Sequence, residues 1–396
     1  MASEPWRRNL YVMFFAEFIV IMGFSFVVPF MPLYVQELGD FSGDEAALWS
    51  GIAIGISGIS LFLSGPFWGI ISDRWGRKPM VLRAVFGCAV VLVLAGFAPN
   101  VYFFVVLRFI QGLLSGTVPA ASALVTSSAP REKTSFAMGL LMVAVFTGTT
   151  VGPSFGGLVA DILGYRATFY ISGALLFTGG LLVLLLVKEK FERPPRMASF
   201  SSVWKLAGTG NMLPLLATIC VTGMAAQVVQ PIIPLYIKEL NPAGAVATSA
   251  GLAFALMGLI AAASSIAVGR LGGRVSLRKL LIVSCLGTAL LYLLPVWAQN
   301  TIQLVIFVGL MGLLQGGTVT STASLVGLSL PVSQQGIAYG LAQSATALGN
   351  GLGPMIGGSL VSLVGLRYVF IVSVGLFLLA GTLAARFIGR QPLKET

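Results

Sequence analysis

The amino-acid sequence predicts an all-α membrane protein of twelve transmembrane helices, arranged as two similar six-helix bundles. Three observations lead to this fold class. Of the 396 residues, 57% are hydrophobic and only 9% are charged, whereas soluble domains carry about 25% charged residues. The apolar residues gather in runs long enough to cross a bilayer. Lys and Arg gather in every second interval between those runs. Such a chain cannot cover a soluble globule with polar surface.

Each predicted helix is an apolar run close to the roughly 20 residues that cross the hydrocarbon core. The first run is much longer than the apolar region of a secretory signal peptide, so it is predicted as the first span. A charged, Pro- and Ser-bearing interval at 188–210 is predicted as a cytoplasmic linker between the bundles 1–187 and 211–396. The predicted spans are 10–36, 48–71, 80–98, 101–124, 135–159, 166–187, 212–238, 248–269, 280–298, 301–326, 336–362 and 367–388.

The basic residues predict the orientation of these spans. With both termini in the cytoplasm, 20 of the 24 Lys and Arg residues lie at the cytoplasmic side. Only Arg166, Lys238 and Arg367 lie outside, and Arg108 lies within a span. This bias is the positive-inside pattern of membrane proteins. The net charge of +11 is therefore explained by cytoplasmic loops, and no nucleic-acid partner is expected.

The two halves repeat each other at an offset near 200 residues. Four ordered pairs of segments match: 29–38 with 231–240, 116–125 with 317–326, 149–157 with 350–358, and 164–166 with 365–367. A parallel duplication of two six-span bundles is typical of one transporter architecture, with a central cavity between the halves.

The cytoplasmic loop between spans two and three, GIISDRWGRK (69–78), places an acid among three bases. Basic residues alone would anchor the loop, but Asp73 needs a further reason. A carboxylate there can pair with a neighbouring Arg or cap a helix N-terminus, and such a contact can hold one state of a transporter.

This loop resembles the GxxxDRxGRK signature of the major facilitator superfamily. The matching residues are Gly69, Asp73, Arg74, Gly76, Arg77 and Lys78. The resemblance implies a loop that gates the cytoplasmic side. In the second half, Gly273 stands in place of Asp73, which implies an asymmetric gate.

Two further motifs resemble the drug:proton antiporter branch of that superfamily, the bacterial multidrug and tetracycline exporters. LRFIQG (107–112) is similar to the R-x-x-Q-G element that is linked to proton coupling, and it contains Arg108 and Gln111. GTTVGPSFGG (148–157) is similar to the antiporter motif of span five. Its residues Gly148, Gly152, Pro153, Gly156 and Gly157 predict close helix packing and a kink. The second half replaces Arg108 with Gly309 and Gln111 with Gly312.

One carboxyl group is predicted to lie deep in the membrane. Of the thirteen acidic residues, only Glu17 lies within a span. A charge at the bilayer centre costs about 2.5–3.5 kcal/mol on insertion scales, and burial favours the neutral acid. Glu17 and Arg108 are therefore predicted to serve proton coupling, Glu17 by loading and unloading a proton. The alternative is a Glu17 that only packs or snorkels.

Glu17 and Arg108 are expected at different depths. Glu17 lies roughly 10–12 Å above the inner boundary, and Arg108 roughly 10 Å below the outer one. In a core of about 30 Å, a relation through water or substrate is favoured over a direct ion pair.

The substrate cavity is defined only weakly by the sequence. The candidate polar residues within or at the ends of spans are Tyr34, Gln111, Gln227, Gln230, Tyr236, Gln315, Gln343 and Asn350. Each also fits interhelical hydrogen bonding. Many of the 26 Phe and 13 Met residues face lipid, and some suit an adaptable apolar cavity.

The resemblance implies proton-driven efflux of amphipathic drugs by alternating access, and hence antibiotic resistance. Two alternatives on the same scaffold stay open: proton-coupled uptake of a solute such as a sugar, and translocation of a lipid or glycolipid. An enzyme is not expected, because the sequence shows no catalytic cluster. With no histidine, His-based triads, metal sites and proton relays are excluded. We expect a monomer in the bacterial inner membrane, powered by the proton gradient and without metal or cofactor.

Overall fold

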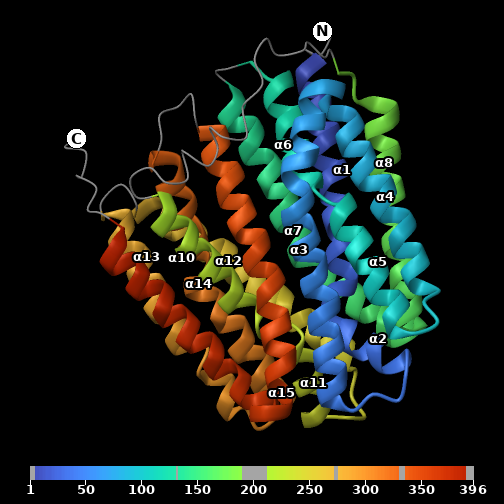
Figure 1. The fold of residues 1–396 in the computed structure, drawn as a ribbon, viewed down its shortest axis with the longest axis vertical. Helices are drawn as coiled ribbons and strands as arrows, with labels where there is room; N and C mark the ends of the chain where they lie inside the picture. The colour runs from blue at the N-terminus through green and yellow to red at the C-terminus, as the bar shows by residue number, and fades with distance from the viewer. Residues whose placement is uncertain (1–4, 131–132, 190–211, 272–274, 330–334, 389–396) are drawn as a thin grey trace. The chain divides into compact units, whose positions relative to one another are not determined.

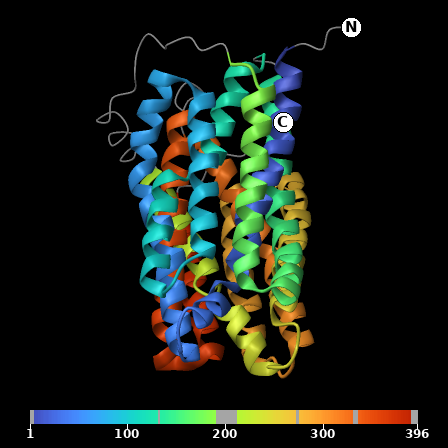
Figure 2. The same cartoon turned by 90° about the vertical axis from the view of Figure 1, so that its right-hand side faces the viewer.

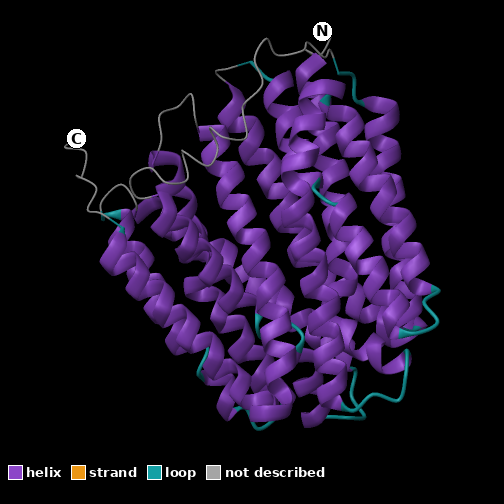
Figure 3. Ribbon diagram, viewed as in Figure 1, coloured by secondary structure: helices purple, strands orange, loops and turns teal. Residues whose placement is uncertain are grey.

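The protein is described from a computed structural model covering residues 5–130, 133–189, 212–271, 275–329 and 335–388. These residues form helices and no strand (Figure 3). Eleven of the described helical segments are long and apolar enough to span a membrane. The last, α15 (Gln335–Phe387), contains Gly365, whose φ of 78° and ψ of 160° are not helical. It therefore joins the last two predicted spans. The all-α membrane fold is confirmed.

The described helices form two compact units, and the first holds most of the N-terminal half (Figure 1). In it α1 packs on α7 and α8, and α4 packs on α8 (Figure 2). Its helices are α1 (Pro5–Val27), η1 (Val28–Phe30), α2 (Met31–Glu37), α4 (Arg77–Gly96), α5 (Val101–Leu114), α6 (Thr117–Ser128), α7 (Thr134–Leu163) and α8 (Tyr165–Leu186).

The second unit holds most of the C-terminal half. Its helices are α10 (Met212–Gln227), α11 (Ile232–Leu240), α13 (Leu277–Leu291), η3 (Leu294–Trp297), α14 (Thr301–Ser329) and α15. A hydrophobic cluster of buried residues from α10, α13, α14 and α15 includes Ile219, Cys285 and Leu325. Two helices, α3 (Gly43–Trp75) and α12 (Val246–Leu271), contribute to both units. The predicted bundle boundaries at 187 and 211 stay a prediction.

The contact between α1 and α7 depends on glycines spaced four residues apart. Residues at this spacing share one face of a helix. A Cβ atom on any of the three would overlap the backbone of α1. Gly148, Gly152 and Gly156 lie against the carbonyl groups of Phe18, Met22 and Phe26, respectively. The glycines therefore let the two backbones touch, which is how small residues join membrane helices.

The same contact recurs between α10 and α15 in the second unit. Gly349, Gly353 and Gly357 lie against the carbonyl groups of Cys220, Met224 and Val228, respectively. Each glycine follows its N-terminal counterpart by 201 residues and each carbonyl by 202. The sequence repeat is thus a structural repeat, and residues of the two halves can be paired by these offsets.

The C-terminal end of α7 is fastened to the first turn of α12 within the first unit. The Asp161 carboxylate accepts hydrogen bonds from the backbone N–H groups of Ala247 (3.3 Å) and Thr248 (2.8 Å), and from the Thr248 hydroxyl (2.6 Å). A negative charge at a helix N-terminus is favourable, because the first N–H groups lack partners within the helix. Gly157 lies beside this contact, against the Ala247 carbonyl.

Candidate functional site

Glu17 lies on α1 with only 1% of its surface exposed, and it is the one buried acid among the described residues. The hydroxyl of Thr117, the first residue of α6, donates a hydrogen bond to the Glu17 carboxyl group. The carboxyl atom Oε1 is also buried and has no hydrogen-bond partner among the described residues. This unpartnered oxygen is a suitable position for a transferable proton, because no other donor occupies it.

The predicted fourth span is broken beside Glu17. The helix α5 ends at Leu114 and α6 begins at Thr117, with Gly116 in a left-handed conformation at φ 112°. Pro119 explains the break, because it has no N–H to bond the carbonyl four residues earlier, and its ring clashes with that carbonyl. That carbonyl belongs to Ser115. Glycine at 116 supplies the positive φ that other residues rarely adopt.

Side chains of α3 and α4 satisfy the carbonyl groups that the break releases. The Trp68 indole N–H donates to the Leu113 carbonyl at 2.7 Å, and Arg83 Nη2 donates to the Ser115 carbonyl at 3.3 Å. The Arg83 guanidinium also lies over the Trp68 ring, 3.7 Å from its centroid, in a cation–π contact. The charge count assigns Arg83 to the cytoplasmic side, whereas its side chain stabilises the interior of this bundle.

Arg108 and Gln111 lie on α5, each with 5% of its surface exposed. Arg108 Nη1 donates to Gln111 Oε1, so the R-x-x-Q spacing brings the two side chains together one helical turn apart. The Gln111 carbonyl accepts the Ser115 hydroxyl at 2.8 Å. The contact that the structure describes for the Glu17 carboxyl group is with Thr117. The role of Glu17 and Arg108 in proton coupling stays a prediction.

Lys78 and Glu189 join the N-terminal end of α4 to the C-terminal end of α8. The Glu189 carboxylate accepts from the backbone N–H groups of Arg77 (2.8 Å) and Lys78 (2.9 Å). The Lys78 ammonium donates to the carbonyls of Leu184 (2.9 Å) and Val187 (2.7 Å). Each charge thus caps the helix terminus that it complements. Arg77 and Lys78 of the predicted gating loop therefore help to join α4 to α8 within one unit.

The other predicted loop residues are placed around this contact. Gly76 connects α3 to α4 at a positive φ of 97°, and Gly69 has open space beside it. Arg74 lies exposed in the last turn of α3. The side chain of Asp73 lies outside the described residues, so its gating role stays a prediction.

Replacing Glu189 with Ala is expected to destabilise the protein by about 1–2 kcal/mol, because two N–H groups of α4 lose their charged cap. The measurement is thermal unfolding of the purified protein in detergent. Lys188→Ala is the matched control, since Lys188 meets Asn9 through its backbone. Equal melting temperatures for Glu189→Ala and the parent would contradict this capping role.

Two predicted cavity residues are instead fully buried packing residues. Tyr34 and Tyr236 each have 0% exposure. The Tyr34 hydroxyl donates to the Ala95 carbonyl at 2.6 Å, and the Tyr236 hydroxyl lies 3.1 Å from the Ala298 carbonyl. They are equivalent residues of the repeat, and each holds a helix end in its own half. Neither is therefore proposed as a cavity residue.

The remaining candidates lie on helices, except Gln230, which lies in the turn between α10 and α11. Gln343 is exposed, while Gln227, Gln230, Gln315 and Asn350 are half-buried. Gln230 Oε1 has no partner among the described side chains. Their role in substrate binding stays a prediction.

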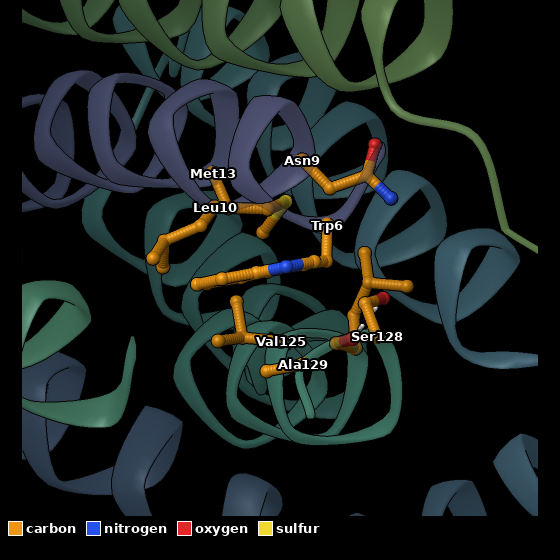
Figure 4. A pocket seen from close by; sticks show the side chains of 8 residues that line it. Trp6, Asn9, Leu10, Met13, Val125, Ser128 and Ala129 are labelled. Carbon is orange, nitrogen blue, oxygen red and sulfur yellow. Dashed lines mark hydrogen bonds between the residues drawn. The ribbon is translucent and has the colours of Figure 1, made fainter. Parts of the chain in front are cut away.

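The groove between α1 and α6 is closed near the start of α1. Trp6, Leu10 and Met13 face Val125 and Ala129 across it (Figure 4). The side chains leave no enclosed space for a water molecule. This part of the α1–α6 contact is packing rather than a ligand site.

Four site residues are not singled out by the sequence reasoning: Thr117, Glu189, Arg83 and Trp68. The signal for Thr117 is present, since Gly116 and Pro119 interrupt an apolar span. Interrupted spans of this kind point to binding sites in transporters. No comparable signal marks Glu189, whose acceptor role depends on where α4 begins.

The comparisons with known proteins agree with this structure. The family model described as Major Facilitator Superfamily matches residues 13–247 and 215–396. The chain is 34% identical over 372 residues to "Multidrug resistance protein MdtG" of Escherichia fergusonii, covering 93% of this chain and 91% of the relative. It is also 34% identical over 378 residues to "Multi-drug resistance efflux pump PmrA" of Streptococcus pneumoniae serotype 4, covering 93% of each.

Solved structures share the fold. A bacterial homologue of the human lysosomal transporter Spinster superposes with a TM-score of 0.83 at 15% identity, covering 98% of each chain. The human organic anion transporter MFSD10 has a TM-score of 0.72 at 20% identity, covering 96% of this chain and 99% of that one. The helical repeat and the matching family model indicate a transporter rather than an enzyme. The chain belongs to the major facilitator superfamily.

Proposed function

We propose that this protein exports amphipathic drugs from the bacterial cell in exchange for protons, with Glu17 as the proton-carrying group. The names of its relatives support multidrug efflux. The arrangement around Glu17 supports the proton exchange. It is a buried carboxyl group in a transmembrane helix, and one of its oxygens has no hydrogen-bond partner among the described residues.

The observation that carries the proposal is the burial of Glu17. Intramembrane acids are costly and are kept where they bind ions or move protons. The substrate and the proton need not contact each other. It is enough that binding of one favours the conformational state from which the other dissociates. Arg108, which donates a hydrogen bond to Gln111, is proposed to act with Glu17 in this coupling.

The test is transport by the purified protein in liposomes, with ethidium as the probe. An outward-directed proton gradient is imposed, and ethidium uptake into the liposomes is followed by fluorescence with encapsulated DNA. Uptake that requires the gradient and the protein supports the proposal. Gradient-driven accumulation of a sugar, or lipid movement without ethidium transport, would overturn it in favour of the corresponding alternative function.

One proton per substrate is expected, because one acid lies buried in the described spans. Exchange of one proton for one monovalent cation moves no net charge, so only the pH term, about 1.4 kcal/mol per pH unit, drives transport. A potassium diffusion potential set with valinomycin is therefore expected to leave ethidium uptake unchanged. Uptake driven by that potential alone would contradict the one-for-one exchange.

A further inference from the structure

The break in span four occurs in only one of the two halves that the structure describes. The equivalent helix of the second half, α14, runs from Thr301 to Ser329 without interruption. It passes through Gly317, the counterpart of Gly116, with helical geometry. The two segments, GTVPAASALV and GTVTSTASLV, are otherwise similar. Something specific to the first half therefore maintains the break.

Four residues that make or line the break are replaced in the second half, whereas Gly116 and Thr117 are kept as Gly317 and Thr318. At offsets of 200 to 202 residues, the pairs are Pro119 with Thr320, Arg83 with Ser284, Trp68 with Val268, and Glu17 with Ile219. The pairing holds in space, because a Cβ atom on Gly317 would meet Ser284 and Val268. Ile219 lies in a hydrophobic cluster. Thus the half without the acid also lacks the proline, the cation and the indole.

The break presents the start of a twelve-residue helix inside the bundle. Gly116 precedes α6 and provides no side-chain cap, so the first N–H groups of α6 lack the usual acceptor. A helix N-terminus carries partial positive charge, and discontinuous helices of transporters turn such ends toward anionic groups. The Thr117 hydroxyl, at this end of α6, forms a hydrogen bond with the Glu17 side chain.

Few other charged groups lie on the helices that pack against α1. Those helices are α6, α7 and α8. The first carries no titratable residue. The others carry Asp161 near the end of α7 and Tyr165, Arg166 and Tyr170 in the first turns of α8. Arg108 and Cys88 lie on the neighbouring α5 and α4. Thr117 is thus the polar group joined to Glu17 in the described structure.

We infer that the break in span four holds Thr117 and the N-terminal end of α6 against Glu17. There they stabilise the carboxylate after its proton has left. On this inference Thr117 is a positioning residue of the proton-exchange step. The O–H bond at the Glu17 carboxyl breaks, the proton passes to water, and the Thr117 hydroxyl and the helix end hold the remaining charge. The inference rests on the proposed function.

The test measures the protonation of Glu17 without using transport. Dicyclohexylcarbodiimide modifies protonated carboxyl groups in apolar surroundings, and mass spectrometry of the Glu17 peptide reports the extent. Labelling is followed against pH for the protein in nanodiscs. Thr117→Val keeps the side-chain shape but removes the donor. It is expected to move the labelling midpoint upward by about one pH unit, a tenfold change in the protonation equilibrium.

Two further variants separate this role from a structural one. Thr117→Ser keeps the hydroxyl and is expected to restore the parent midpoint. Pro119→Thr introduces the residue of the unbroken helix and is expected to move the midpoint in the same direction as Thr117→Val. The matched control is Thr318→Val, because Thr318 is also buried, at 3% exposure against 4% for Thr117, and occupies the same place in the repeat.

A Thr117→Val midpoint equal to that of the parent would overturn the inference, and so would an equal shift in Thr318→Val. Failure of the proposed function has a different signature. In that case ethidium transport ignores the proton gradient in the parent protein, whatever the labelling curves show. Ethidium uptake at one fixed gradient then reports whether a shifted midpoint in Thr117→Val also slows the exchange.

Discussion

Replacing Glu17 with Gln is expected to abolish gradient-driven accumulation of ethidium while leaving downhill movement intact. At one pH unit, a one-for-one exchange sustains a concentration ratio of about ten, since one pH unit corresponds to about 1.4 kcal/mol. The amide is similar in size to the carboxylic acid but releases no proton, so the ratio is expected to fall to about one. The measurement is steady-state ethidium accumulation in liposomes at a fixed gradient.

Asp44→Asn is the matched control for this prediction. Asp44 is an exposed acid in the first turn of α3, so the same chemical change there is expected to leave accumulation unchanged. Downhill exchange in Glu17→Gln shows that the variant is folded and still binds the probe. Full accumulation by Glu17→Gln would remove Glu17 from the coupling mechanism.

Replacing Gly156 with Ala is expected to have the largest effect on stability. The new Cβ atom would overlap the backbone carbonyl of Phe26 on α1, and neither helix backbone can move aside without loosening the neighbouring contacts at Gly148 and Gly152. Overpacking of this kind costs about 1–3 kcal/mol. We expect a lower apparent melting temperature in detergent, by about 5 °C, and reduced ethidium transport, because α1 carries Glu17.

Gly139→Ala tests whether the effect depends on the contact or on helix propensity. Gly139 lies on the same helix, α7, and a Cβ atom there meets nothing within 4 Å. Alanine is the better helix former by about 1 kcal/mol, so Gly139→Ala is expected to leave the melting temperature unchanged or raise it. If both variants melt together, close contact at Gly156 is not what holds α7 on α1.

Most of the helical architecture could be predicted because it depends on properties that the sequence displays directly. The length of an apolar run fixes where a helix crosses lipid, and the described helices fall where those runs lie. The repeated glycines Gly148, Gly152 and Gly156 predict a close helix contact from spacing alone. The burial of Glu17 follows from its isolation among apolar residues.

The contacts around Glu17 could not be predicted in the same way. An apolar run of the right length looks continuous, so counting residues does not reveal the break at Ser115 and Gly116. The pairing of Thr117 with Glu17 joins residues 100 positions apart, and it depends on how α6 packs against α1. Likewise, Glu189 belongs to a charged interval, and only the position of the α4 N-terminus identifies what it binds.

The positions of Tyr34 and Tyr236 also could not be predicted from the sequence. Polar groups at the ends of spans are expected to face a cavity or a neighbouring helix, and the sequence does not distinguish the two. In the structure Tyr34 and Tyr236 bond backbone carbonyls inside their own units. Their hydroxyl groups are thus used in helix packing.

The most direct measurement is proton release by the purified protein in weakly buffered detergent solution when ethidium is added. The coupling proposed for Glu17 predicts that the parent protein releases protons on binding the probe and that Glu17→Gln binds it without releasing any. Equal proton release from the parent and from Glu17→Gln would contradict the assignment of the transported proton to this carboxyl group.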